Sequence, residues 1–270
     1  MKNKSEQCLT AQELTEVQAN VPVPEESHVR LSPRVALGED ARKGIASLLG
    51  GRFSGMYELS KKTHERFGLH QVGVPGQAPG FPGIEQAARS FTPDDFVLAS
   101  EYQKPALLIS PPDKTREQLF AAISAHHNPG ARKWPKIYEA DHAGCQPEDQ
   151  YRGYIVEGAS RILIRPDDDD SLVLPLIQRI VRKQERRESN EWGMTGDLYA
   201  LLAMQSIVRG QMIDRETFTV FDGEPVVANC FVPVGHCRNE KPAMEWLPSN
   251  IGKMGHGRFR RVLGGRPIDV

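Results

Sequence analysis

The chain has little cysteine and lacks any long apolar run. Its four cysteines, Cys8, Cys145, Cys230 and Cys237, are too few and too scattered for a disulfide scaffold in 270 residues. A reducing cytoplasm is therefore the default expectation. No stretch approaches the roughly 18 apolar residues of a membrane helix, so we expect no membrane association. The basic start at residues 1–7 is followed by no apolar segment, which argues against a secretory signal peptide.

An excess of charge of one sign is also missing. Lys and Arg number 34 against 35 Asp and Glu, which gives a net charge of −1. The sequence therefore lacks the global basic character of many nucleic-acid-binding proteins, and any basic partner surface has to be local. The Gly- and Pro-rich stretch 73–83 lacks the Lys-Ser or Lys-Thr ending of a phosphate-binding loop. No His-Glu-x-x-His or Gly-x-Ser-x-Gly motif is present.

The clearest fold signal lies between residues 167 and 210. An acidic turn at 167–170 precedes an amphipathic basic helix at about 175–188, and a polar break leads to a second, largely apolar helix. Asp197 lies in the first turn of that second helix, which ends near Arg209, before Gly210. This pattern establishes architecture and names no reaction.

Other segments complete an α+β prediction. We expect helices at 38–49 (ended by Gly50-Gly51), at 53–68, from Thr92-Pro93 onward and at 114–127; strands are expected at 106–109, 151–165, 218–221, 226–232, 243–247 and 259–263. Asp222-Gly223 predicts a hairpin turn between two of these strands. The expected division is an N-terminal arm at 1–52, a mixed α/β body at 53–194, and a helix plus β-rich C-terminal subdomain at 195–270.

The C-terminal segment also carries a resemblance. The helix ending at Arg209-Gly210, a β hairpin, the Gly235-to-Arg238 loop, Glu245-Trp246 and the closing 263–267 are similar to the C-terminal segments of uncharacterised bacterial proteins of a domain-of-unknown-function family. The resemblance covers about 195–270. It implies a bacterial origin and a compact β-rich end, and it brings no catalytic residue with it.

One region combines residues that could perform hydrolysis. His126, His127, Asp141, His142 and Cys145 could form a metal-assisted site or a thiol nucleophile with its base. Their order fits no signature with a physical rationale. The histidine pair precedes Asn128-Pro129-Gly130 at a helix end, where histidine also complements the helix dipole. We favour this ordinary explanation, so the hydrolase remains an alternative.

A second group could ligate zinc. Cys230, His236, Cys237 and His256 supply the thiolate and imidazole ligands that zinc prefers. Cys230 and Cys237 are further apart than the ligands of a usual zinc knuckle, and adjacent residues of an extended strand point in opposite directions. We favour a buried strand cysteine and a polar loop, and expect neither metal nor cofactor.

Basic and aromatic residues suggest binding surfaces. Arg182 and Arg186 lie on the basic helix face, while Arg258, Arg260 and Arg261 lie in the C-terminal segment and could meet phosphates. A solvated helix face is the usual meaning of such a stripe. Trp192, in the polar break, could anchor a partner or could cap the core between the two helices.

These observations favour a non-enzymatic cytoplasmic interaction protein with a protein partner. The leading hypothesis rests on Trp192 and Arg182. The alternatives are the hydrolase and nucleic-acid binding through the basic C-terminal segment. The ligand, the partner and the oligomeric state do not follow from the sequence.

Overall fold

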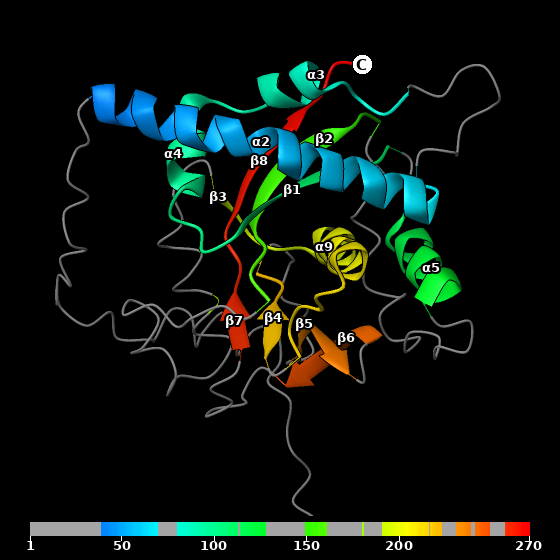
Figure 1. Ribbon diagram of the computed structural model, residues 1–270. Coiled ribbons are helices and arrows are strands. Elements are labelled where there is room, and N and C mark those ends of the chain that lie inside the picture. Colours follow the sequence, from blue (N-terminus) through cyan, green and yellow to red (C-terminus); the bar gives the residue numbers. More distant parts are fainter. Residues whose placement is uncertain are drawn as a thin grey trace, which may run out of the picture.

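The computed structural model describes residues 39–69, 80–112, 114–127, 149–160, 180, 191–215, 217–222, 231–238, 241–248 and 257–270. Helices and two sheets are combined in it, as the α+β prediction requires (Figure 1). None of the described helices is long and apolar enough to cross a membrane.

The first sheet contains strands from both halves of the chain. Its strands are β1 (Pro105–Ser110), β2 (Arg152–Glu157), β3 (Glu191–Trp192) and β8 (Val262–Pro267). They lie in the order β1-β2-β8-β3, and every neighbouring pair is antiparallel. The predicted buried strand at 106–109 is confirmed, because all four of its residues are buried in β1.

Helices cover both faces of this sheet (Figure 1). Leu107 and Leu263 pack with α2 (Glu39–Phe67), α3 (Ile84–Arg89) and α4 (Pro93–Ala99) on one side. Leu108 and Val262 pack with α5 (Arg116–His127) and α9 (Gly196–Arg209) on the other. Neighbouring residues of a strand point to opposite faces, so the continuous apolar run of β1 supplies both cores.

Two helix boundaries follow from local chemistry, as the sequence predicted. Thr92 caps α4: its hydroxyl oxygen accepts from the Asp95 amide, and the Asp95 carboxylate accepts from the Thr92 amide at 2.7 Å. Gly210 ends α9 with φ of 69°. A glycine tolerates that left-handed conformation without the steric cost of a side chain. At the start of α9 the Thr195 hydroxyl oxygen accepts from the Leu198 amide at 3.4 Å, a cap that was not predicted from the sequence.

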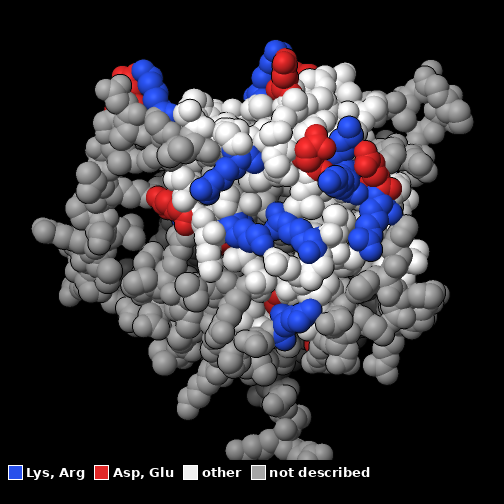
Figure 2. Space-filling model, viewed as in Figure 1, with Lys and Arg blue, Asp and Glu red and all other residues white. Residues whose placement is uncertain are grey.

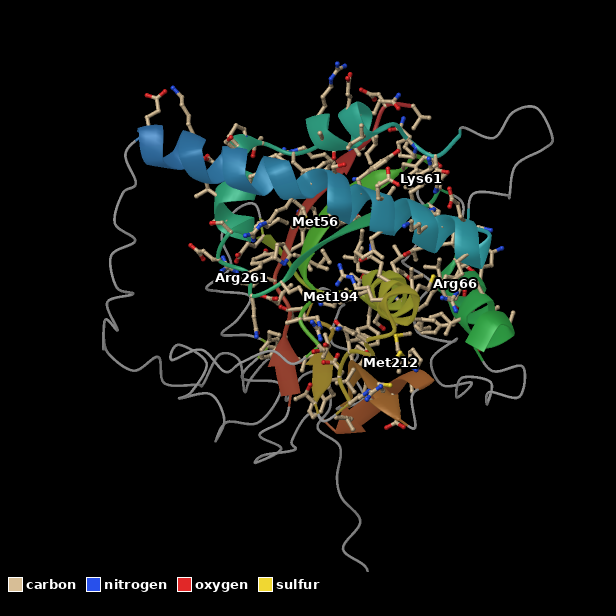
Figure 3. All side chains as sticks on the ribbon, in the orientation of Figure 1. Met56, Lys61, Arg66, Met194, Met212 and Arg261 are labelled. Atoms are coloured by element: carbon tan, nitrogen blue, oxygen red, sulfur yellow. The ribbon has the colours of Figure 1, made fainter. Side chains whose placement is uncertain are left out.

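The expected stop at Gly50-Gly51 is wrong, because α2 continues through both glycines for 29 residues. A Cβ at either glycine would meet no atom within 4 Å, so neither residue is there to allow a close approach. On the side that faces the core, α2 buries Phe53 and Met56, and Figure 3 labels Met56 on α2 together with the exposed Lys61. Tertiary packing of that side outweighs the low helix propensity of glycine.

The second sheet consists of residues after 217. Its strands are β4 (Phe218–Val220), β5 (Phe231–Arg238), β6 (Lys241–Pro248) and β7 (Gly257–Phe259), in the order β6-β5-β4-β7. β4 pairs antiparallel with β5, but Val220 lies opposite Val234. A tight turn at Asp222-Gly223 would place Val220 opposite residue 225, so the predicted turn is wrong as the connection between these strands; residues 223–230 lie outside the described part of the chain. Only β4 and β7 run parallel among these pairs.

The single strand expected at 259–263 is also wrong. β7 ends at Phe259 in the second sheet, and β8 begins at Val262 in the first. The chain changes sheets at Arg260 and Arg261, whose side chains both pair with carboxylates. The C-terminal segment therefore contributes to both sheets, while the proposed domain boundaries stay a prediction.

Candidate functional site

Trp192 is the most exposed large apolar side chain in the described part of the chain, with 56% of its surface accessible. It lies on β3, at one end of the first sheet, opposite Val262 of β8. Of the two interpretations of this tryptophan, the exposure favours a surface residue over one that caps the core. An exposed indole on a regular strand has a fixed backbone and a free apolar surface.

The Trp192 ring adjoins a glycine on β8. Gly265 has φ of 80°, and a Cβ built there would lie 3.5 Å from Trp192 Nε1 and 3.0 Å from Tyr154 Cε1. A side chain at this position would be strained by the backbone and crowded by the Tyr154 ring, whereas its contact with Trp192 would be an ordinary one. Gly265 therefore leaves room for the Tyr154 ring and adjoins the Trp192 ring.

An arginine completes the surface. Arg152 Nη1 donates to the Gly265 carbonyl at 2.8 Å, and Arg152 is two residues from Tyr154 on β2. We refer to Arg152, Tyr154, Trp192 and Gly265 as the Trp192 patch. Arg152 and Tyr154 are partly buried, and each ends in a polar group. The exposed indole of Trp192 lies beside them. Trp, Tyr and Arg are the residue types that most often dominate the energy of protein interfaces.

The opposite edge of the sheet is closed by side chains. On β1, the outward carbonyl of Leu107 accepts from Gln205 Nε2 of α9 at 2.5 Å. The outward carbonyl of Ile109 lies 2.7 Å from His64 Nε2 of α2, within hydrogen-bonding distance. Both side chains are buried. Because the free carbonyls of an edge strand are the groups that would pair with another strand, these two bonds block addition there. The exposed apolar residue lies at the other end of the sheet.

A buried charge cluster joins the two sheets. Arg260 and Asp214 are both fully buried and form an ion pair with 2.8 Å between Arg260 Nη2 and Asp214 Oδ1. Arg260 Nη1 donates to the carbonyls of Glu157 and Ala159 at the end of β2, and its Nε donates to Thr219 of β4 at 2.7 Å. One side chain therefore binds groups from both sheets.

Arg261 connects β3, the strand that contains Trp192, to the residues that follow α4. Its guanidinium pairs with Glu191, the residue before Trp192, and with Glu101 at 2.8 Å, and it lies over the Tyr102 ring. Figure 3 labels Arg261. Burial alone would lower the pKa of Arg261, but the charge of Glu191 and the hydrogen bond to Glu101 raise it above its usual value. Arg261 is therefore a permanent cation that anchors β3.

These contacts correct part of the nucleic-acid prediction. Arg260 and Arg261 have only 1% and 7% of their surface exposed, and both are paired with carboxylates. Neither guanidinium faces solvent, where a phosphate backbone would have to meet it. Arg258 lies on β7, but its side chain is not described, and Arg182 and Arg186 lie outside the described residues.

The predicted catalytic residues remain a prediction. His126 and His127 end α5, as the sequence indicated, but their side chains are not described. Asp141, His142 and Cys145 lie outside the described residues.

The predicted zinc ligands are only partly placed. Cys237 is buried in β5, and His236 Nε2 lies 3.2 Å from Glu245 Oε1. Cys230 and His256 lie outside the described residues. Within the part of the chain that is described, no three His, Cys, Asp or Glu side chains are arranged to hold a metal ion.

Comparison with known proteins gives no relative to reason from: no family model, curated protein or solved structure matches the chain. The resemblance of residues 195–270 to a bacterial family therefore stays a prediction.

The sequence pointed to Trp192 but not to its neighbours. Arg152 and Tyr154 precede it by about 40 residues, and Gly265 follows it by more than 70, so no local pattern links them. The alternation of Arg152, Tyr154 and Val156 along one strand was the available signal, and it says nothing about strand order.

Proposed function

We propose that this protein is a non-enzymatic binding protein that recognises a protein partner through the Trp192 patch. The observation that carries the proposal is the exposure of Trp192 beside Tyr154 and Arg152. A partner that covered this surface would remove apolar area from water while Arg152 supplied polar contacts at the rim.

The size of the effect supports a role in binding. With 56% of the residue exposed and a full tryptophan surface of about 250 Å², roughly 140 Å² remains for a partner to cover. At about 25 cal/mol per Å² this area corresponds to roughly 3.5 kcal/mol of transfer free energy. Only part of it appears as affinity, because association also costs translational and side-chain freedom.

Neither alternative function has comparable support. The hydrolase hypothesis depends on His126, His127, Asp141, His142 and Cys145, whose side chains lie outside the description. The nucleic-acid hypothesis has lost the exposed guanidinium groups of Arg260 and Arg261. Protein recognition is the hypothesis whose binding residues, those of the Trp192 patch, lie within the described part of the chain.

The test compares Trp192→Ala with Ile84→Ala. Ile84 is another exposed apolar side chain, 37% accessible, at the start of α3, and is outside the patch, so its truncation is the matched control. Wild type and both variants would be used to isolate partners from the cells that produce the protein. Calorimetry with the purified partner would then give each dissociation constant.

We expect Trp192→Ala to weaken the complex by about 2 kcal/mol, or roughly thirtyfold, and Ile84→Ala to leave it unchanged. Equal melting temperatures of the three proteins would show that the fold is intact. A partner that binds Trp192→Ala as tightly as wild type would refute the assignment, and so would the lack of any partner for wild type.

A further inference from the structure

Two basic residues lie where α9 ends and β1 begins. Arg209 is the last residue of α9, and Lys104 directly precedes β1. Lys104 Nζ donates to Gln211 Oε1 at 3.0 Å, which fixes the ammonium group beside the end of α9. The Arg209 side chain is partly buried. Both charges belong to the ends of regular elements, so their positions are set by the fold.

Most other covered arginines are neutralised. Arg116 pairs with Asp197 at 2.9 Å, Arg260 with Asp214, Arg261 with Glu101 and Glu191, and Arg266 with Asp95 at 3.1 Å. No described carboxylate pairs with Arg209 or with Lys104. Figure 2 shows that some Lys and Arg side chains on the face in view stand next to Asp or Glu, whereas others are surrounded by uncharged surface.

The two charges are unfavourable in the unliganded protein. Burial lowers the pKa of Arg209, and burial together with the Arg209 charge lowers the pKa of Lys104. A surface arginine at a helix end can be explained by the helix dipole alone. That explanation does not account for a second cation beside it, because the dipole supplies only about half a negative charge.

We propose that Lys104 and Arg209 bind an oxyanion, and specifically the phosphate group of a small-molecule ligand. Two positive charges match a phosphate dianion, and the planar guanidinium presents paired donors to its oxygens. Gln211 directs its oxygen to Lys104, which leaves its amide nitrogen as a third donor. Anion binding converts the repulsion between the two cations into attraction. The site shares no residue with the Trp192 patch and does not depend on it.

The first test measures the reactivity of lysine side chains in the intact protein. A limiting amount of an amine-acylating reagent would be added with increasing inorganic phosphate at constant ionic strength, and peptide mass spectrometry would follow each lysine. Lys62, an exposed residue of α2, is the internal reference. If the dissociation constant is on the order of 1 mM, about 10 mM phosphate slows Lys104 acylation roughly tenfold relative to Lys62.

The second test removes the guanidinium. Arg209→Gln should abolish most of the protection of Lys104, whereas Arg66→Gln should retain it. Arg66 also lies in the last turn of a helix and is exposed, so it controls for the loss of a helix-end charge. A parallel series with acetate would show whether carboxylate ligands share the site.

Equal phosphate effects on Lys104 and Lys62 in the wild-type protein would overturn the proposal without any variant. Protection that persists in Arg209→Gln would overturn it as well. If Arg209→Gln does not fold, the wild-type comparison of the two lysines decides.

Discussion

The Arg260–Asp214 ion pair gives the sharpest prediction about stability. Arg260→Met keeps much of the side-chain volume and removes the charge. The change leaves the fully buried Asp214 carboxylate without its cation and removes the donor from the carbonyls of Glu157 and Ala159. Breaking a buried pair from one side costs about 3–5 kcal/mol, because an uncompensated charge stays in the interior. Unfolding free energies of domains are about 5–15 kcal/mol, so this loss is a large fraction.

The assay is urea unfolding followed by circular dichroism for the wild type, Arg260→Met, Asp214→Asn and the double variant. Asparagine suits position 214 because it keeps the shape and tolerates the φ of 52° there. We expect the double variant to be more stable than the sum of the single losses predicts, by about 1–3 kcal/mol, since it contains no uncompensated charge. Arg89→Met is the control: Arg89 and Glu85 form an exposed pair, 81% and 84% accessible, worth less than about 0.5 kcal/mol.

A decrease in the free energy of unfolding of less than about 1 kcal/mol in Arg260→Met would refute the reasoning, because an unpaired buried carboxylate destabilises a fold by more than that. Strict additivity in the double variant would also refute it. If Arg260→Met does not fold, Asp214→Asn and Arg260→Lys still test the pair. Lysine keeps the charge but cannot reproduce the planar set of donors, so its cost should lie between those of wild type and methionine.

Two further predictions concern Tyr199. Burial, with a further contribution from the Asp214 charge, raises the pKa of the Tyr199 hydroxyl well above 10. Above about pH 10 the unfolded chain therefore loses the Tyr199 proton while the folded protein keeps it. The free energy of unfolding should then fall by up to about 1.4 kcal/mol per pH unit. Tyr199→Phe should lack this increment in urea unfolding between about pH 9 and 11, and equal slopes for the two proteins would contradict the assignment. A Cβ at Gly235 would lie 2.4 Å from Tyr199 Cε1, so Gly235→Ala should lower the free energy of unfolding by at least about 1–3 kcal/mol. Gly55→Ala, on the open side of α2, should instead raise it by up to about 1 kcal/mol, and similar effects of the two alanines would rule out the packing argument.

What the sequence predicted correctly was set by short-range chemistry. Thr92-Pro93 starts α4, and Gly210 ends α9, because caps involve residues within one turn of each other. The apolar run of β1 likewise reports burial on both faces. Each of these features depends on a few consecutive residues, so a single sequence contains the whole signal.

The failures came from long-range contacts. Gly50-Gly51 normally indicates a helix end, but α2 is held by packing against residues far along the chain. Arg260 and Arg261 resemble a basic surface in the sequence, yet their acidic partners lie between 46 and 160 residues away. No composition argument distinguishes a buried guanidinium from an exposed one, because the distinction depends on where Asp214, Glu101 and Glu191 fold.

Two acidic side chains, Glu191 and Asp222, fix the backbone beside the proposed binding surface. Glu191 is held by Arg261, and the amide of Met194 donates to Asp222 Oδ1 at 3.0 Å, so the backbone is fixed on both sides of Trp192. A side chain on a fixed backbone loses little freedom when a partner covers it, and more of the transfer free energy then appears as affinity. If the proposed surface binds a partner, Arg261 contributes indirectly, because it holds Glu191 and so fixes the backbone beside Trp192. Arg261→Met should thus weaken partner binding less than Trp192→Ala does. If Arg261→Met instead lowers the free energy of binding by more than it lowers the free energy of unfolding, Arg261 contacts the partner directly.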